Sequence, residues 1–299
     1  MLDVREAAQV PDVRDWTERR DRHRGRVTAL LGPYLRERGR GRCNPVVDFL
    51  FTYYNLTPGQ LRRWHPGFGV TLAGPESREY VNLRGYRRTD AGVSVDPGHL
   101  ARRRDTIGYV AGLMTATASR PAHLACFGMH EWAMAYRADP AQLRHNVPLR
   151  LGHGGTDAVV ESMPLRCTHF DAFRFFTEPA RPRNAAQLTR AAQVDTEQPG
   201  CLHAAMDLYR FAAKLLPLVD SDLLMDAFEL AYDARVLDMR ASPYDLSGYG
   251  YNAIPVETPA GRADYVRQQA ALANRSAPIR AALLERCHKL LEQVPGRDG

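Results

Sequence analysis

Histidines and carboxylates recur within or beside apolar stretches of this sequence between His123 and Asp245. Burying such groups costs free energy unless each finds a partner, a bound metal or a shifted pKa. Groups of this kind concentrate where enzymes perform acid–base or metal chemistry. We therefore expect an enzyme whose chemistry lies in this part of the chain. Five short segments carry the pattern: His130-Glu131, His153 to Asp157, His169 to Asp171, His203 to Asp207 and Asp238 to Asp245.

The first segment lies in residues 122–137, an apolar stretch that predicts a buried helix. His123 precedes His130 by seven residues, so a helix would place both on one face. A buried Glu131 requires a cation, a metal or a raised pKa. This favours a catalytic role for His130 and Glu131, and a structural ion pair between Glu131 and an arginine is the alternative.

The second segment, Gly152 to Asp157, is rich in glycine and carries His153, Thr156 and Asp157. Glycine lets the backbone approach a ligand closely. The segment therefore predicts a substrate-binding loop, and an ordinary turn is the alternative.

The third segment places His169 and Asp171 two residues apart, on the same side of an extended chain. Such a pair can supply two ligands to a non-haem iron, with a distant histidine as the third. It can equally be a general base and the carboxylate that orients it. Phe170 between them is expected either to stack on a substrate or to join the core.

The fourth segment places His203 and Asp207 four residues apart in a predicted helix over 200–216. This spacing can present both side chains to one metal ion or substrate. The alternative is a solvated helix face with an ion pair between Asp207 and Arg210.

The fifth segment begins at Asp238, near the C-terminal end of a predicted helix over 221–238. A carboxylate is electrostatically disfavoured there, so Asp238 is expected to have a specific partner, with Arg240 the nearest candidate. The loop after this helix carries Asp245 and several tyrosines, and loops on rigid elements often hold catalytic residues.

The elements that must position these residues are mostly helices. Two apolar helices are expected after residue 97, at 105–119 and 122–137, joined by Arg120-Pro121, while 148–170 reads as loops and short strands. Residues 78–97 predict a small hairpin. The class is therefore mainly α with minor strands, in one compact helical catalytic domain (43–299) after a basic helical arm (1–42). The remaining helices are expected at 12–40, 200–216, 221–238, 261–273 and 277–292.

Composition agrees with a globular protein, because 44% of the 299 residues are hydrophobic and 25% are charged. The formal net charge is +6, and arginine supplies 38 of the 40 basic residues. Between Arg19 and Arg42 nine arginines meet only Asp21 and Glu37, a local balance of +7. Such a segment can neutralise phosphates, or it can be the solvated face of a helix.

Five widely spaced cysteines without a C-x-x-C pair favour a reducing compartment over a disulfide framework. Cys126, Cys167 and Cys201 each lie near a histidine and admit a zinc site, although paired ligand spacing is absent. The N-terminus is charged, and no apolar run approaches the roughly 20 residues of a membrane span. We expect a cytoplasmic protein with no membrane partner, and the sequence leaves the oligomeric state open.

Six phrases between about Arg42 and Val256 carry a family resemblance: NPVVDFLFTYYNLTPGQLRRWHPGFG, CFGMHEWAMAYR, LRLGHGGTDAVVE, CTHFDAFRFFT, EQPGCLHAAMDLYRFA and LDMRASPYDLSGYG. They are similar to an actinobacterial family described as 3-methyladenine DNA glycosylases. The resemblance implies hydrolysis of an N-glycosidic bond in a nucleobase-containing substrate, including DNA, without a cofactor. The hairpin and catalytic aspartate of helix-hairpin-helix glycosylases have no match, so no catalytic residue carries over from those enzymes.

That reaction needs a carboxylate, an activated water, and a pocket that stacks the base. Histidine can protonate or hold the base, and arginine can contact phosphate. The expected catalytic residues are Asp157, Asp171 and Asp238, with His130, Glu131 and His169. The expected substrate-binding residues are Trp132, His153, Thr156, Phe170, Asp207, Arg240, Tyr244, Asp245 and Tyr251.

Two other functions fit the same residues. A metal-dependent enzyme acting on a small molecule would hold iron, or zinc, through His130, His169, Asp171 and His203. A helical protein that binds a ligand without catalysis is the third. The histidines and carboxylates in apolar segments favour an enzyme over a pure binding protein.

Overall fold

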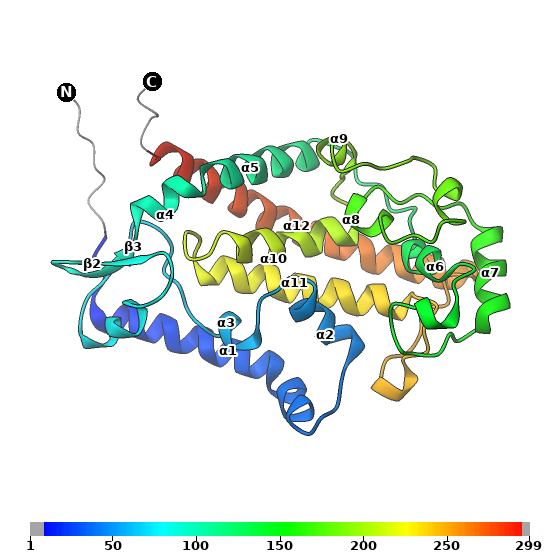
Figure 1. Ribbon diagram of the computed structural model, residues 1–299, viewed down its shortest axis with the longest axis horizontal. Coiled ribbons are helices and arrows are strands. Elements are labelled where there is room, and N and C mark those ends of the chain that lie inside the picture. The colour runs from blue at the N-terminus through cyan, green and yellow to red at the C-terminus, as the bar shows by residue number, and fades with distance from the viewer. Residues whose placement is uncertain (1–8, 295–299) are drawn as a thin grey trace.

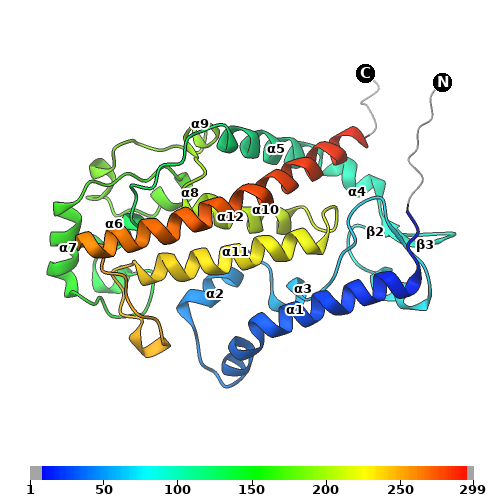
Figure 2. The ribbon, with the colours of Figure 1, turned by 180° about the vertical axis from the view of Figure 1, so that it is seen from behind.

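Three long helices, α10, α11 and α12, run side by side along the long axis of the molecule (Figure 1). They belong to a computed structural model that describes residues 9–294. Figure 2 shows α5 alongside α12, and these two helices pack against each other. The predicted class, mainly α with minor strands in a single compact domain, is confirmed. The bounds are α5 Arg104–Ala118, α10 Leu202–Lys214, α11 Ser221–Arg240 and α12 Pro259–Glu292.

Local sequence explains where the long helices begin. The Asp220 side chain accepts a hydrogen bond from the backbone N–H of Leu223 and starts α11. Thr258 caps α12 in the same way, and Pro259 occupies its first turn. The prediction of two helices at 261–273 and 277–292 is wrong, because α12 continues through Pro278. Packing of α12 against α5, α10 and α11 outweighs the hydrogen bond that proline removes.

The expected N-terminal helix is α1 (Val13–Gly39). Both α1 and α2 (Pro45–Thr52) pack on α11. Trp16, Val27 and Leu31 of α1 are buried in the main hydrophobic core. Seven of the nine arginines in the basic segment form ion pairs with acidic side chains, several of which lie on α11. The basic segment is therefore largely neutralised by the protein itself.

One end of the molecule carries a small antiparallel sheet in the order β1-β3-β2 (Figure 1). The paired β2 and β3 confirm the predicted hairpin, although the start of 78–97 belongs to a 3-10 helix. The bounds here are α3 Pro58–Leu61, β1 Thr71–Leu72, η1 Pro75–Tyr80, β2 Tyr86–Thr89, β3 Gly92–Val95 and α4 Pro97–Arg102.

Short helices gather at the opposite end of the bundle (Figures 1 and 2). The predicted helix over 122–137 is wrong over its first half, because α6 begins only at Met129. Phe127 (φ 50°) and Gly128 (φ 70°) adopt left-handed backbone conformations that a helix excludes. His123 therefore does not share a helix face with His130. The bounds are α6 Met129–Ala135, η2 Pro140–Gln142, α7 Gly152–Ser162, α8 Phe170–Phe173, η3 Arg181–Arg183, α9 Gln193–Thr196 and η4 Ser247–Tyr249.

The prediction of loops and short strands over 148–170 is also wrong, because residues 152–162 form α7. The helix buries Thr156, Val159 and Val160 and packs on α6. This apolar face outweighs the low helix propensity of the glycines in the first turn. None of the helices within residues 9–294 combines the length and the apolar run that crossing a membrane requires.

Candidate functional site

The connection between α10 and α11 is short, so the two helices are antiparallel and the start of α10 meets the end of α11. His203 lies in the first turn of α10 and Asp238 in the last turns of α11. Helix α6 brings His130 and Glu131 to the same region, since His130 bonds to Asp238. The polar cluster therefore occupies the end of the bundle away from the sheet (Figure 1).

A buried chain of contacts joins the two ends of this cluster. The ring nitrogen Nε2 of His130 lies 2.7 Å from Oδ1 of Asp238. Arg235, fully buried, donates to the other Asp238 oxygen at 3.0 Å and to Glu131 at 2.8 Å. The expected pairing of Asp238 with Arg240 is wrong, because Asp238 pairs with His130 and Arg235, while Arg240 donates to the carbonyl of Asn252.

The ionisation of these side chains is set by their contacts. Burial alone would raise the pKa of Asp238, but the neighbouring His130 lowers it below its ordinary value. The same pairing raises the pKa of His130 well above its usual range, against the effect of burial. Burial likewise opposes ionisation of Glu131, yet Arg235 lowers its pKa to about 2. Both carboxylates are therefore charged inside the protein.

His203 completes a group that could hold a metal ion. Its ring lies edge-on to His130 with centroids 4.5 Å apart. One ligand atom from each of His130, His203 and Asp238 lies within 4.8 Å of the other two. Burial, reinforced by His130, lowers the pKa of His203 well below its ordinary value. His203 is therefore a neutral imidazole, the form that coordinates metals.

A second buried group lies beside the first. His169, immediately before α8, places Nε2 3.2 Å from Oε1 of Glu197 and 3.3 Å from Oδ2 of Asp207. The rings of His169 and His203 have centroids 5.2 Å apart, so the two groups are neighbours. The predicted ion pair between Asp207 and Arg210 is confirmed at 3.1 Å, although this face is buried rather than solvated.

Asp171 is engaged by arginines instead of histidines. Arg210 donates to its Oδ2 at 2.6 Å, and Arg190 binds both carboxylate oxygens. Burial opposes ionisation, but these two guanidinium groups lower the pKa of Asp171 to about 2. The ring of Phe170 lies beneath the Arg190 guanidinium, 4.8 Å from it. Asp171 therefore anchors arginines and is not in either group of possible metal ligands.

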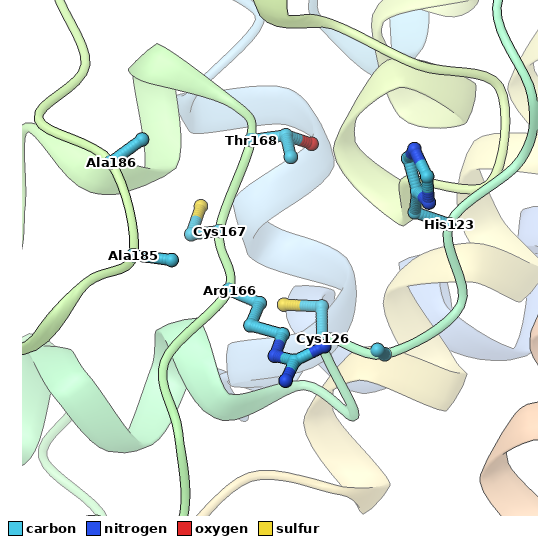
Figure 3. A pocket seen from close by; sticks show the side chains of 8 residues that line it. His123, Cys126, Arg166, Cys167, Thr168, Ala185 and Ala186 are labelled. Atoms are coloured by element: carbon cyan, nitrogen blue, oxygen red, sulfur yellow. The ribbon is translucent and has the colours of Figure 1, made fainter.

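A cavity of about 330 Å³ adjoins the first group. Figure 3 shows that its lining comes from three separate stretches of chain, around His123, Arg166 and Ala185. Cys126 lines this cavity, and its Sγ lies 3.5 Å from Nδ1 of His130. The Cys126 side chain therefore lies between this cavity and His130.

A second cavity, of about 10 Å³, is lined by both Glu131 and Asp171. That volume is close to what one water molecule needs. His203 and three aromatic rings, Phe49, Tyr53 and Phe175, complete much of its wall.

The Gly-rich segment does not supply a loop to this cluster. His153 is exposed, and the Thr156 hydroxyl donates to the carbonyl of Gly152 in its own helix. Asp157 accepts a hydrogen bond from the backbone of Arg137. The segment is the start of a helix, and none of these three residues contacts the polar cluster in the described structure.

The aromatic and loop residues expected to bind substrate have mostly structural contacts. Trp132 is fully buried and donates to the carbonyl of Ala241. Asp245 is exposed and bonds Ser247, and Tyr251 lies 3.5 Å from the Asn44 amide. Tyr244 comes closest to the cluster, because its ring contacts His145, which lies 3.2 Å from Arg235.

Sequence reasoning missed Arg235, Glu197 and Arg190. Arg235 had a usable signal, since it lies three residues before Asp238 on one face of an apolar helix. Glu197 and Arg190 lie in an irregular connector whose pattern predicts no placement.

Comparison with protein-family models, curated proteins and solved structures finds no match to this chain. The buried side chains themselves therefore have to indicate the function.

Proposed function

We propose that this protein is a metal-dependent enzyme whose ion is held by His130, His203 and Asp238. The observation that carries the proposal is the convergence of these three buried side chains, with ligand atoms within 4.8 Å of one another. Two imidazoles and one carboxylate form the donor set of many non-haem iron sites, and a similar set holds catalytic zinc. Iron(II) is the ion we favour.

The charge of the site supports a cation. Five carboxylates are at most 3% exposed, and four arginines contact them within the described chain, which leaves one negative charge. Uncompensated buried charge is strongly disfavoured. A proton on His130 or His169 can balance this charge, and a divalent cation can displace such a proton. The five carboxylates are Glu131, Asp171, Glu197, Asp207 and Asp238.

The surroundings of the ligands fit a metal centre as well. Arg235 fixes Asp238 through Oδ2, so Oδ1 is the oxygen directed at the histidines. Outer contacts of this kind orient ligands and tune the ion. A bound ion would supply Lewis acidity, and the protein would supply its orientation and the exclusion of water.

The 330 Å³ cavity is where we place a small-molecule substrate. Among the described residues, only the Cys126 side chain is seen to link its wall to His130, and the basic side chain of Arg166 borders it (Figure 3). Its size falls at the lower end of the range for ligand pockets, which is about 300–1,000 Å³. A small, largely apolar molecule with an anionic group suits this lining.

The test is metal analysis of the full chain purified without chelator. We expect at least one iron per chain in the wild type and about one fewer in His203→Ala. His65→Asn is the matched control, because His65 is a buried histidine outside the cluster. Stoichiometric zinc would correct the ion and keep the site. Metal-free wild type, or His203→Ala with the same metal content as the wild type, would overturn the proposal.

Hydrolysis of an N-glycosidic bond, the activity implied by the family resemblance, is the second candidate. It is favoured by the small cavity that sets Glu131 and Asp171 beside three aromatic rings. Such a reaction needs a carboxylate, a water and an aromatic wall, although a base would have to displace side chains to enter. Abasic-site formation on alkylated DNA by EDTA-treated protein, lost in Asp171→Asn, would support this activity and overturn the metal proposal.

A further inference from the structure

We infer that a second divalent cation binds between His169, Glu197 and Asp207. One ligand atom from each of these residues lies within 4.8 Å of the other two. All three side chains are at most 3% exposed. A catalytic role for this second ion rests on the proposed function, although its ligands are not those of the first site.

The imidazole of His169 is the independent sign of a ligand. Both ring nitrogens are buried and lack a hydrogen-bond partner among residues 9–294. Unpartnered buried polar atoms are rare and require an explanation, such as an ion. Nε2 nevertheless points at two carboxylates, so the ring is aimed into an anionic site.

The distances from Nε2 of His169 to the two carboxylate oxygens suit a shared metal ion better than a hydrogen bond. Nε2 lies 3.2 Å from the Glu197 oxygen and 3.3 Å from the Asp207 oxygen, without hydrogen-bond geometry to either. A charge-assisted hydrogen bond would be about 2.7–2.9 Å. Ligands that each lie about 2.1 Å from a shared ion are separated by roughly 3.0–3.4 Å. The imidazole is therefore spaced from both carboxylates as ligands around a common centre would be.

Neighbouring residues hold the two carboxylates in place. Arg210 donates to Oδ2 of Asp207 at 3.1 Å. The Gln193 amide donates to Oε1 of Glu197, and Arg190 holds the Gln193 side chain at 2.7 Å. A carboxylate oxygen can accept such a bond and still offer a lone pair to an ion.

The donor set defines the class of ion. One imidazole and two carboxylates form a harder set than that of the first centre, and such sets suit manganese or iron(II). The rings of His169 and His203 lie 5.2 Å apart, so the two ions would be neighbours. Paired ions can stabilise both the attacking and the leaving oxygen in a displacement.

The experiment titrates chelator-stripped full chain with MnCl2 and counts bound ions by the loss of the free Mn²⁺ electron paramagnetic resonance signal. We expect two ions in the wild type and one in Glu197→Gln, which keeps the shape of the side chain. Asp207→Asn is the second variant, and Glu178→Gln, an exposed glutamate, is the control with two ions.

The variants separate the two proposals. Wild-type stoichiometry in both folded Glu197→Gln and Asp207→Asn overturns the second site. The second site is also overturned if the wild type binds a single ion that is lost in His203→Ala and kept in Glu197→Gln. That result would leave the first site in place. Loss of one ion in Glu197→Gln, with His203→Ala unchanged from the wild type, supports the second site and rejects the first.

Discussion

Arg235 and Asp238 lie one turn apart on α11, and the guanidinium of Arg235 holds Oδ2 of Asp238 at 3.0 Å. This contact leaves Oδ1 of Asp238 to His130. The same guanidinium nitrogen bonds Glu131, so one buried cation fixes two carboxylates from different helices. The ion pair therefore couples the fold of the bundle end to the geometry of the proposed metal ligands.

Replacing Arg235 tests this coupling. Arg235→Gln leaves Glu131 and Asp238 without their shared cation, so we expect the free energy of unfolding to fall by about 3–5 kcal/mol. Urea denaturation measures the change. Arg267→Gln breaks an exposed pair with Asp264 and should change stability by less than about 1 kcal/mol. Equal effects of the two substitutions would contradict the buried role of Arg235.

Stability should fall on acidification because of His65. This buried histidine contacts the Tyr86 hydroxyl, and burial lowers its pKa to about 3 from 6.5. Below pH 6.5 His65 therefore takes up a proton in the unfolded chain, whereas in the folded chain it stays neutral until the pH approaches 3. The contribution of His65 is present above pH 6.5 and is lost between pH 6.5 and 3.

At pH 5 we expect His65 to remove about 2 kcal/mol from the wild-type free energy of unfolding relative to pH 8. Urea denaturation at both pH values measures this, and His65→Asn should show a smaller decrease by that amount. An identical pH dependence in the variant would show that His65 is not the group responsible.

Leu31 tests whether α1 is part of the core. Its side chain is fully buried, whereas Leu35, one turn later on α1, is 38% exposed. Leu31→Ala should destabilise the protein by about 2–5 kcal/mol, because a buried cavity remains. Leu35→Ala should cost much less in the same thermal or urea measurement. A loosely attached α1 would instead give small effects at both positions.

Removal of divalent cations should destabilise the native protein. An ion that binds only the folded chain adds about 2.7 kcal/mol when its free concentration is 100 times its Kd. We expect EDTA to lower the Tm of the wild type by several degrees, as measured by differential scanning calorimetry. In His203→Ala the decrease should be smaller. A Tm that EDTA leaves unchanged in the wild type would argue against structural coupling of the ion.

The long helices other than α12 were predictable because their apolar periodicity is local. Residues 200–216 and 221–238 correspond closely to α10 and α11. The errors at α7 and at 122–128 have physical causes in tertiary packing and in left-handed backbone at Phe127 and Gly128. Neither cause is visible in a propensity pattern.

The site was predictable where polar residues interrupt apolar sequence. His130, His203 and Asp238 stood out in this way, and the structure brings them together. Glu197 lies in a polar connector where a carboxylate carries no signal. Arg235 was obscured because arginine is abundant along the whole chain. Which polar residues meet depends on long-range packing, and local pattern does not report it.

The lengths of the antiparallel helices α10 and α11 set the relative positions of two ligands of the proposed metal site. His203 and Asp238 lie at the open end of this pair, so their alignment depends on the length of both helices. Each residue inserted into an α-helix rotates the remainder of that helix by about 100°. A single insertion between Ser221 and Asp238 would therefore turn the carboxylate out of register with His203 while most of the bundle could still assemble. Length variation among related chains should accordingly be confined to the loops outside the pair.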